Sequence, residues 1–274
     1  MFNSQKRNIL VTGAYKGIAY ATIERLISEP TPYEIIITSR DEKSGQKAID
    51  TLREKYPQST STLLYHQLDI NNDESVDKLV SWVRNSIGKL DILVNNAAVI
   101  YYGDLTFEQK KHTIQTNYFS VVKFTEKLLP YLSDDGKILN ISSEMGQLAI
   151  QGETLRNALG DSRLTQEKLD DIAERVVDLV FDYKEYGPAK EPIYPASKAL
   201  LNAYTRYFLV FKLKETQQVY LVHPGWVKTD MGGPDAPGTV QESADTITYV
   251  INLPFKKHAE LNARMIGDKK VMDY

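Results

Sequence analysis

The sequence predicts an α/β protein, in which a doubly wound parallel sheet carries helices on both faces and forms a single domain over residues 1–274. Short β-rich apolar runs alternate with helical stretches, as they do in parallel sheets with crossover helices. A glycine-rich turn joins the first of these runs to an amphipathic helix. Hydrophobic residues make up 42% of the chain, enough for a substantial core, and α/β folds of 274 residues are often single domains.

The elements follow one another in a regular order. Strands are expected at residues 9–11, 34–38, 63–67, 91–94, 137–141, 219–222 and 264–266, and their apolar character fits burial on both faces. Helices are expected after the glycine turn and at 75–87, 106–132 and 196–213. Right-handed crossovers would bring the carboxyl ends of the strands to one edge, where such sheets bind ligands.

The glycine turn after the first strand reads Thr-Gly-Ala-Tyr-Lys-Gly-Ile over residues 12–18. Gly13 and Gly17 would let backbone N–H groups approach a pyrophosphate, and the dipole of the helix behind them favours anions. An ordinary strand-to-helix turn is the alternative interpretation. The strand before it and the amphipathic helix after it supply the context that a phosphate-binding turn requires.

Ser39 and Arg40 follow the second strand and bear on the choice of coenzyme. A carboxylate at this point would bond a ribose 2′-hydroxyl and repel a 2′-phosphate. Ser39 offers no such repulsion, whereas Arg40 offers a planar fork suited to phosphate, and Lys16 could add a second cation. Both cations could also be ordinary surface charges. The pattern favours NADP(H) over NAD(H).

Three further strand ends carry polar groups. Asp69 and Ile70 end the third strand, and Asn-Asn-Ala-Ala at 95–98 ends the fourth, so both segments could line an adenosine pocket. Ser143 ends the fifth strand, where its hydroxyl can orient a carbonyl oxygen. The Gly-x-Ser-x-Gly elbow of hydrolases is missing, which argues against Ser143 as a nucleophile.

Tyr194 and Lys198 stand four positions apart in the run Tyr-Pro-Ala-Ser-Lys, so one helical turn would carry both on the same face. The cation is expected to lower the pKa of the phenol and make it a usable proton donor or acceptor. A solvated helix surface is the alternative. Asn117, in the long expected helix, would either form a kink or cap, or anchor a water that links Lys198 to solvent.

Composition excludes several other functions. The net charge of −3, without a basic block, argues against nucleic acid as a partner. The chain has no cysteine, and its four histidines are scattered without ligand spacing, so no metal site is expected. We expect no signal peptide, no membrane association and a cytoplasmic location, because the first eight residues are polar and no apolar run could span a bilayer.

Taken together, these motifs resemble the short-chain dehydrogenase/reductase superfamily, which has a Rossmann-like fold of three α/β/α layers. The resemblance covers essentially the whole chain, although Ala19 and Ala98 replace two glycines of the usual motifs. It implies that Asn117, Ser143, Tyr194 and Lys198 are catalytic. It also implies cofactor contacts from Gly13, Tyr15, Lys16, Gly17, Ile18, Arg40, Asp69, Ile70, Asn95, Ala97, Tyr194, Lys198, Pro224, Gly225, Val227 and Thr229.

The spacing of Ser143 and Tyr194, 51 positions, points to a subgroup, because most members place these residues far closer. Residues 152–190 are therefore an insertion, and apolar residues at helical spacing predict that it forms a helix packed on the body. The chain resembles monomeric NADPH-dependent carbonyl reductase, whose inserted helices cover a surface that relatives use to oligomerise.

The resemblance implies reduction of a ketone, aldehyde or quinone, a small-molecule substrate, by hydride from NADPH and a proton from Tyr194. Ser143 would hold the carbonyl oxygen, and Met145, Trp226 and Met231 would form an apolar wall, although plain core packing is an alternative for these three. Two other functions stay open. One is an NADP(H)-dependent alcohol or steroid dehydrogenase, and the other is a non-catalytic NADPH-binding sensor.

Overall fold

The computed structural model describes residues 6–177, 192–254 and 259–272. Across these residues eight strands form one sheet in the order β3-β2-β1-β4-β5-β6-β7-β8. Neighbouring strands are parallel except for β8, which pairs with β7 in the antiparallel sense. The strands are β1 (Arg7–Val11), β2 (Tyr33–Ser39), β3 (Thr62–Gln67), β4 (Leu90–Asn95), β5 (Leu132–Ile141), β6 (Gln218–His223), β7 (Met265–Gly267) and β8 (Lys270–Met272). The predicted doubly wound sheet is confirmed, and β8 is an addition to it.

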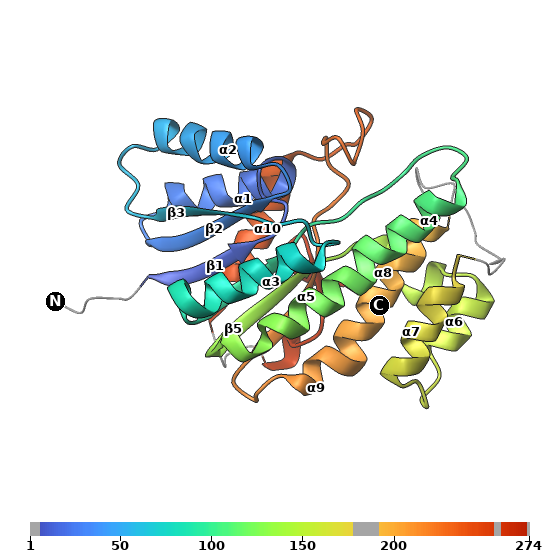
Figure 1. Ribbon diagram of the computed structural model, residues 1–274. Coiled ribbons are helices and arrows are strands. Elements are labelled where there is room, and N and C mark those ends of the chain that lie inside the picture. The colour runs from blue at the N-terminus through green and yellow to red at the C-terminus, as the bar shows by residue number, and fades with distance from the viewer. Residues whose placement is uncertain (1–5, 178–191, 255–258, 273–274) are drawn as a thin grey trace.

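Helices cover both faces of the sheet (Figure 1). One face packs against α1 (Gly17–Ser28), α2 (Glu42–Lys55) and α10 (Val240–Asn252), and the other against α3 (Asp73–Trp82), α5 (Val121–Leu128) and α8 (Ile193–Tyr204). The remaining helices are α4 (Phe107–Ile114), α6 (Glu153–Leu159), α7 (Gln166–Arg175) and α9 (Val210–Lys212). In the described part of the chain, no helix combines the length and the apolar character needed to cross a membrane.

Alternating strand residues build two hydrophobic layers. Ile9 and Val11 of β1 point into the layer beneath α1, α2 and α10, whereas Leu10 between them joins the layer beneath α3, α5 and α8. This alternation follows from the two-residue period of a strand. Because β1 is buried on both faces, it reads as an uninterrupted apolar run, which is why it could be recognised from the sequence.

Side-chain caps fix where several helices begin. Asp41 accepts a hydrogen bond from the backbone N–H of Ser44 (2.8 Å) at the start of α2, and Thr106 and Thr239 form capping boxes at the starts of α4 and α10. Such caps satisfy backbone donors that the first helical turn leaves unpaired.

The expected helix over 106–132 is less regular than predicted. It is divided into α4, a π-helical segment (Gln115–Ser120), α5 and a 3₁₀ turn (Leu129–Tyr131), and Leu132 already belongs to β5. Pro130 lies within the 3₁₀ turn, where its missing N–H costs no helical hydrogen bond. The helices expected at 75–87 and 196–213 also continue into π-helical segments, Val83–Ile87 and Thr205–Leu209.

The insertion packs on the body through α7, as predicted for a helix with one apolar face. Leu169, Ala173 and Val176 are buried in the hydrophobic layer beneath α3, α5 and α8. A buried polar contact adds to this packing, since the Tyr118 hydroxyl donates to Asp170 at 2.6 Å. The last part of the predicted helix falls within residues 178–191, which lie outside the described residues.

Candidate active site

A cavity of about 1070 Å³ lies at the carboxyl ends of the strands. The residues that line it come from the segments after β1, β2, β3, β4, β5 and β6 and from the start of α8. Of the residues predicted for the site, all but two line this cavity: Gly13, Tyr15, Lys16, Gly17, Ile18, Arg40, Asp69, Ile70, Ala97, Ser143, Met145, Tyr194, Lys198, Pro224, Gly225, Trp226, Val227, Thr229 and Met231.

The glycine turn has a backbone that only glycine adopts easily. Gly13 and Gly17 have φ angles of +65° and +64°, in the left-handed region. A Cβ on Gly13 would lie 3.4 Å from the Cα of Ala97, so this turn also packs closely on the segment after β4. The first turn of α1 carries no acidic side chain, and its N-cap, Lys16, makes no side-chain cap bond. Its N–H groups and dipole are therefore open to an anionic group.

The segment after β2 presents Arg40 to the cavity without a competing carboxylate from its neighbours. Ser39 is buried, and its hydroxyl donates to the backbone oxygen of Asp41 at 2.5 Å. The Asp41 carboxylate is occupied by the N-cap of α2. Lys16, the second expected cation, forms an ion pair with Asp230 from the segment after β6, with 2.6 Å between Nζ and Oδ2. Sequence reasoning did not anticipate this pair.

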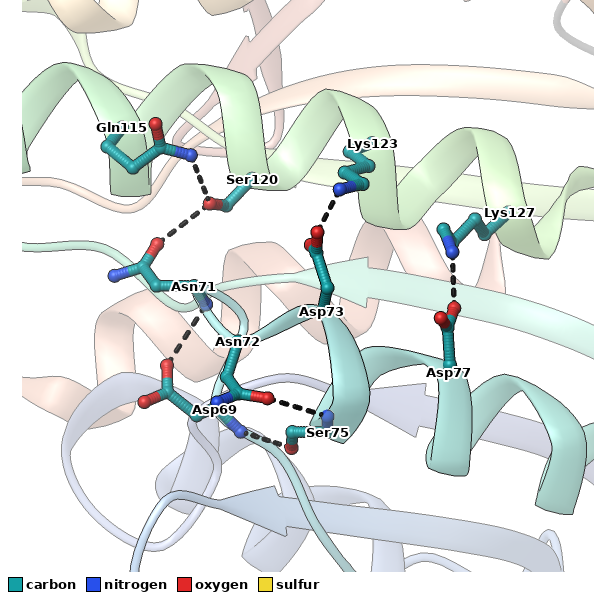
Figure 2. Close-up of polar contacts among 10 residues, drawn as sticks. All are labelled: Asp69, Asn71, Asn72, Asp73, Ser75, Asp77, Gln115, Ser120, Lys123 and Lys127. Atoms are coloured by element: carbon teal, nitrogen blue, oxygen red, sulfur yellow. Dashed lines mark hydrogen bonds and ion pairs between the residues drawn. The ribbon is translucent and has the colours of Figure 1, made fainter.

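Hydrogen bonds tie the segment after β3 to two helices (Figure 2). The Asp69 carboxylate accepts from the backbone N–H of Asn71 (3.0 Å), and the Asp69 backbone N–H donates to Ser75 of α3 (2.9 Å). The Asn71 side chain in turn accepts from the Ser120 hydroxyl (2.7 Å) at the start of α5. Beside this network the pairs Lys123–Asp73 and Lys127–Asp77 join α5 to α3. Asp69 and Ile70 are thereby held in one place on the cavity wall.

Ser143, Tyr194 and Lys198 all line the cavity. The Ser143 hydroxyl oxygen accepts from the backbone N–H of Met145 (3.2 Å), which leaves its proton free to donate to a ligand. The Lys198 ammonium donates to the backbone oxygen of Ile141 (2.8 Å) and lies 5.7 Å from the centroid of the Tyr194 ring. An ammonium has three donors, so this bond leaves Lys198 able to bind a second group.

The expected effect of Lys198 on Tyr194 is wrong for this structure. Burial in the cavity wall raises the pKa of the Tyr194 phenol, and the nearby Tyr102 raises it further. Burial also lowers the pKa of Lys198 to about 8. Loss of hydration disfavours the charged form of either group, and for the phenol no lowering of the pKa by Lys198 offsets it. Tyr194 therefore keeps its proton at neutral pH.

The two predicted residues that do not line the cavity, Asn95 and Asn117, lie behind its wall. The Asn95 amide donates to Thr125 and Asn140 at 2.8 Å each, inside the protein. The Asn117 amide donates to the backbone oxygen of Val99 (2.9 Å) and accepts from the Val99 backbone N–H (2.8 Å). Asn117 sits in the π-helical segment, which is an irregularity of the helix. A kink or cap was one of the two interpretations of this residue.

The Asn117 amide also donates to the Ser197 hydroxyl at 3.1 Å. It therefore joins the segment after β4 to the helix that carries Tyr194 and Lys198.

Aromatic and sulfur-containing side chains also line the cavity. Trp226 is 39% exposed, and its indole N–H donates to the backbone oxygen of Gly232 (2.7 Å). Met145 is buried next to Ser143. The Tyr102 hydroxyl donates to the backbone oxygen of Met231, so the segments after β4 and β6 touch across the cavity.

Sequence reasoning missed several residues that line the same cavity, among them the four side chains of Tyr101, Tyr102, Glu144 and His223. Two of these four could have been predicted from the sequence, because Glu144 directly follows Ser143 and His223 directly precedes Pro224. The tyrosines had no motif of their own, and only their place shortly after the fourth strand pointed to them.

The sequence and the fold are similar to those of known proteins. The model of the short chain dehydrogenase family matches residues 7–155. The (+)-neomenthol dehydrogenase of Arabidopsis thaliana is 33% identical over 289 residues, covering 94% of this chain and 95% of that protein. The NADPH carbonyl reductase 3 of Rattus norvegicus is 31% identical and covers 99% of this chain and 100% of its own. The structure of salutaridine reductase from Papaver somniferum superposes with a TM-score of 0.80 at 30% identity, covering 91% of this chain and 96% of that one.

Proposed function

The chain belongs to the short-chain dehydrogenase family of oxidoreductases, and we propose that within this family it is an NADPH-dependent carbonyl reductase. Its substrates would be small ketones, aldehydes or quinones, which it reduces to alcohols. One observation carries the proposal: the hydroxyls of Ser143 and Tyr194 and the ammonium of Lys198 share one cavity with an anion-accepting glycine turn.

The cavity offers fitting partners for each part of NADPH. The open N-terminus of α1 behind Gly13 and Gly17 would hold the pyrophosphate, and Asp69 would face the adenosine. Arg40, with Lys16 released from Asp230, would bind the 2′-phosphate. When bound, NADPH supplies the hydride.

The residues of the chain would provide orientation and the proton. Ser143, whose oxygen already accepts from Met145, would donate its hydroxyl proton in a hydrogen bond to the substrate carbonyl. Tyr194, kept protonated by burial, would transfer its proton to the oxygen as negative charge develops there. Lys198 would stabilise the resulting phenolate by its charge and bind the ribose with a donor not used by Ile141. Asn117 would hold α8 in register with the segment after β4.

Other assignments use the same residues. An alcohol or steroid dehydrogenase would run the reaction toward oxidation, and a sensor would bind NADPH without turnover. The presence of Ser143, Tyr194 and Lys198 in one cavity favours an enzyme over a sensor. Two cations for a 2′-phosphate favour the reductive direction, because cellular NADP is mostly in its reduced form. We further propose that the enzyme is cytoplasmic, and that it is a monomer because α7 covers the apolar surface beside α8.

The test is NADPH oxidation, followed by its absorbance, over a broad panel of carbonyl compounds. Tyr194→Phe should reduce kcat by roughly 10²- to 10⁴-fold while NADPH binding stays nearly intact, because only the proton donor is lost. Tyr131→Phe is the matched control, since it removes a hydroxyl from the 3₁₀ turn before β5. This turn lies at the amino end of the strand, whereas the cavity lies at its carboxyl end. A Tyr194→Phe variant that kept more than roughly a tenth of the wild-type kcat would exclude this mechanism.

A further inference from the structure

His223 ends β6 and touches the segment that carries Ser143. Its Nδ1 atom lies 3.2 Å from the backbone nitrogen of Glu144. A backbone N–H can only donate, so Nδ1 must be unprotonated in order to accept this hydrogen bond. The neutral ring then carries its proton on Nε2.

We call residues 143–146 the serine turn. Two other side chains hold it: Gln151 donates to the backbone oxygen of Met145 (2.7 Å), and Asn202 of α8 donates to the backbone oxygen of Gly146 (3.0 Å). Neither amide titrates, so both bonds persist over a wide pH range. Among these three contacts to the serine turn, the bond between Glu144 and His223 is the one that a proton can break.

The surroundings of the His223 imidazole have opposite effects on its pKa. The side chain of His223 is 14% exposed, and burial lowers its pKa, whereas Glu144 and Asp268 favour the charged ring. The Glu144 carboxylate lies 3.9 Å from Nε2, and Asp268 lies in the turn between β7 and β8.

Further described neighbours of His223 are uncharged. Ser142 continues β5 beside β6, and Gly267 packs so closely that a Cβ there would lie 3.3 Å from the ring. Ser243 of α10 bonds to the next residue along the chain, Pro224. A proton that enters the ring therefore meets Glu144 and Asp268 as its charged neighbours.

Resting on the proposed reductase function, we propose that His223 is a positioning residue that holds the serine turn against β6 while its ring is neutral and releases the turn when the ring is protonated. A proton from solvent that binds Nδ1 removes the acceptor of the Glu144 N–H. The N–H of Nδ1 then faces the N–H of Glu144, and two donors repel each other, so the backbone of the turn shifts while the Glu144 carboxylate stays beside Nε2. Ser143 moves with the turn and no longer meets the carbonyl oxygen in the productive place.

Two substitutions of His223 separate this role from plain packing. His223→Asn places an amide oxygen close to the position of Nδ1, so it keeps the acceptor and removes the titration. His223→Leu keeps the apolar contacts and removes the acceptor. Wild type should lose kcat/KM as the pH falls below the pKa of His223, while NADPH binding stays constant.

The Asn variant should keep the neutral-pH kcat/KM within about threefold and lose the acid limb of its pH profile. At every pH, the kcat/KM of the Leu variant should be about tenfold below the neutral-pH value of wild type, because the Glu144 N–H is left without a partner. An unchanged acid limb in the Asn variant, or a Leu variant equal to wild type, would overturn the proposal.

A second measurement does not depend on turnover. Nitrogen-15 NMR of the histidine rings at about pH 8 should show His223 as the Nε2–H tautomer, and the Glu144 amide signal should titrate with the same pKa as the ring. A Nδ1–H tautomer, or a Glu144 amide that does not respond, would refute the role of His223. An enzyme that reduced none of the carbonyls would instead refute the proposed function, and the NMR result would still decide this inference.

Discussion

Gly146 offers the sharpest test of how the serine turn is built, because it lies in direct contact with α8. A Cβ at Gly146 would lie 2.6 Å from the Nδ2 atom of Asn202, 2.8 Å from the backbone carbon of Lys198 and 2.9 Å from the Lys198 Cβ. An amide nitrogen can turn aside, but the backbone of α8 cannot. Gly146→Ala must therefore push the serine turn and α8 apart by some tenths of an ångström.

The cost of this substitution appears in stability and in catalysis. Overpacking a filled site costs about 1 to 3 kcal/mol, which corresponds to a fall in Tm of roughly 2 to 12 °C for a domain of this size. Ser143 and Lys198 also move relative to each other. Since a misplacement of about 1 Å can cost 10²-fold in rate, a shift of some tenths of an ångström should lower kcat/KM about tenfold.

Thermal unfolding and steady-state kinetics of Gly146→Ala measure both effects. Gly160→Ala is the matched control: its φ is −88°, which alanine adopts, and its Cβ would make a single close contact, 3.1 Å from the backbone oxygen of Arg156. It should stay near wild type in Tm and in kcat/KM. If Gly146→Ala behaved like Gly160→Ala, the contact between the serine turn and α8 would be looser than the structure shows, and this prediction would be refuted.

Four other predictions concern the coenzyme, the pH dependence and the assembly. Arg40→Asp should reduce the preference for NADPH over NADH at least about tenfold in kcat/KM, since it replaces a phosphate partner by a repelling carboxylate; an unchanged ratio would show that Arg40 does not bind the phosphate. Asp230→Asn should tighten NADPH binding by no more than about fivefold and leave NADH binding unchanged, because exposed pairs such as Lys16–Asp230 are weak; equal effects on both coenzymes would contradict this. The kcat/KM should fall as the pH rises through about 8, where the buried Lys198 loses its proton, and a profile flat to about pH 10 would argue against a role for its charge. Analytical ultracentrifugation should give a mass near 31.1 kDa, and a stable dimer would mean that the insertion 152–190 does not block association.

Local patterns were sufficient to predict most of the sheet. β1 and β6 could be recognised because they are buried on both faces and read as continuous apolar runs. β8 (Lys270–Met272) could not, because it has three residues, two of them exposed, and follows a turn in which Asp268 and Lys269 have positive φ angles. Short exposed strands depend on pairing with a neighbour, which a local pattern does not show.

The location of the site was also predictable, since parallel strands bring their carboxyl ends to one edge. Contacts between different segments were not. The pair Lys16–Asp230 joins residues 214 positions apart, and Glu144 meets His223 across 79 positions. The raised pKa of Tyr194 could not be predicted from the sequence either, because it depends on burial by the assembled fold and not on the neighbouring Lys198.

The insertion 152–190 shares the core of the protein through α6 and α7, so it cannot be removed without a change to the rest of the chain. Leu155 and Leu159 of α6 and Leu169 of α7 belong to the same hydrophobic layer as the body of the protein. Deleting the insertion would expose that layer to water and favour aggregation. A chain without α6 and α7 would therefore need different residues on this surface, or another subunit to cover it. Removal of residues 152–190 would require a simultaneous change of the surface beneath α6 and α7.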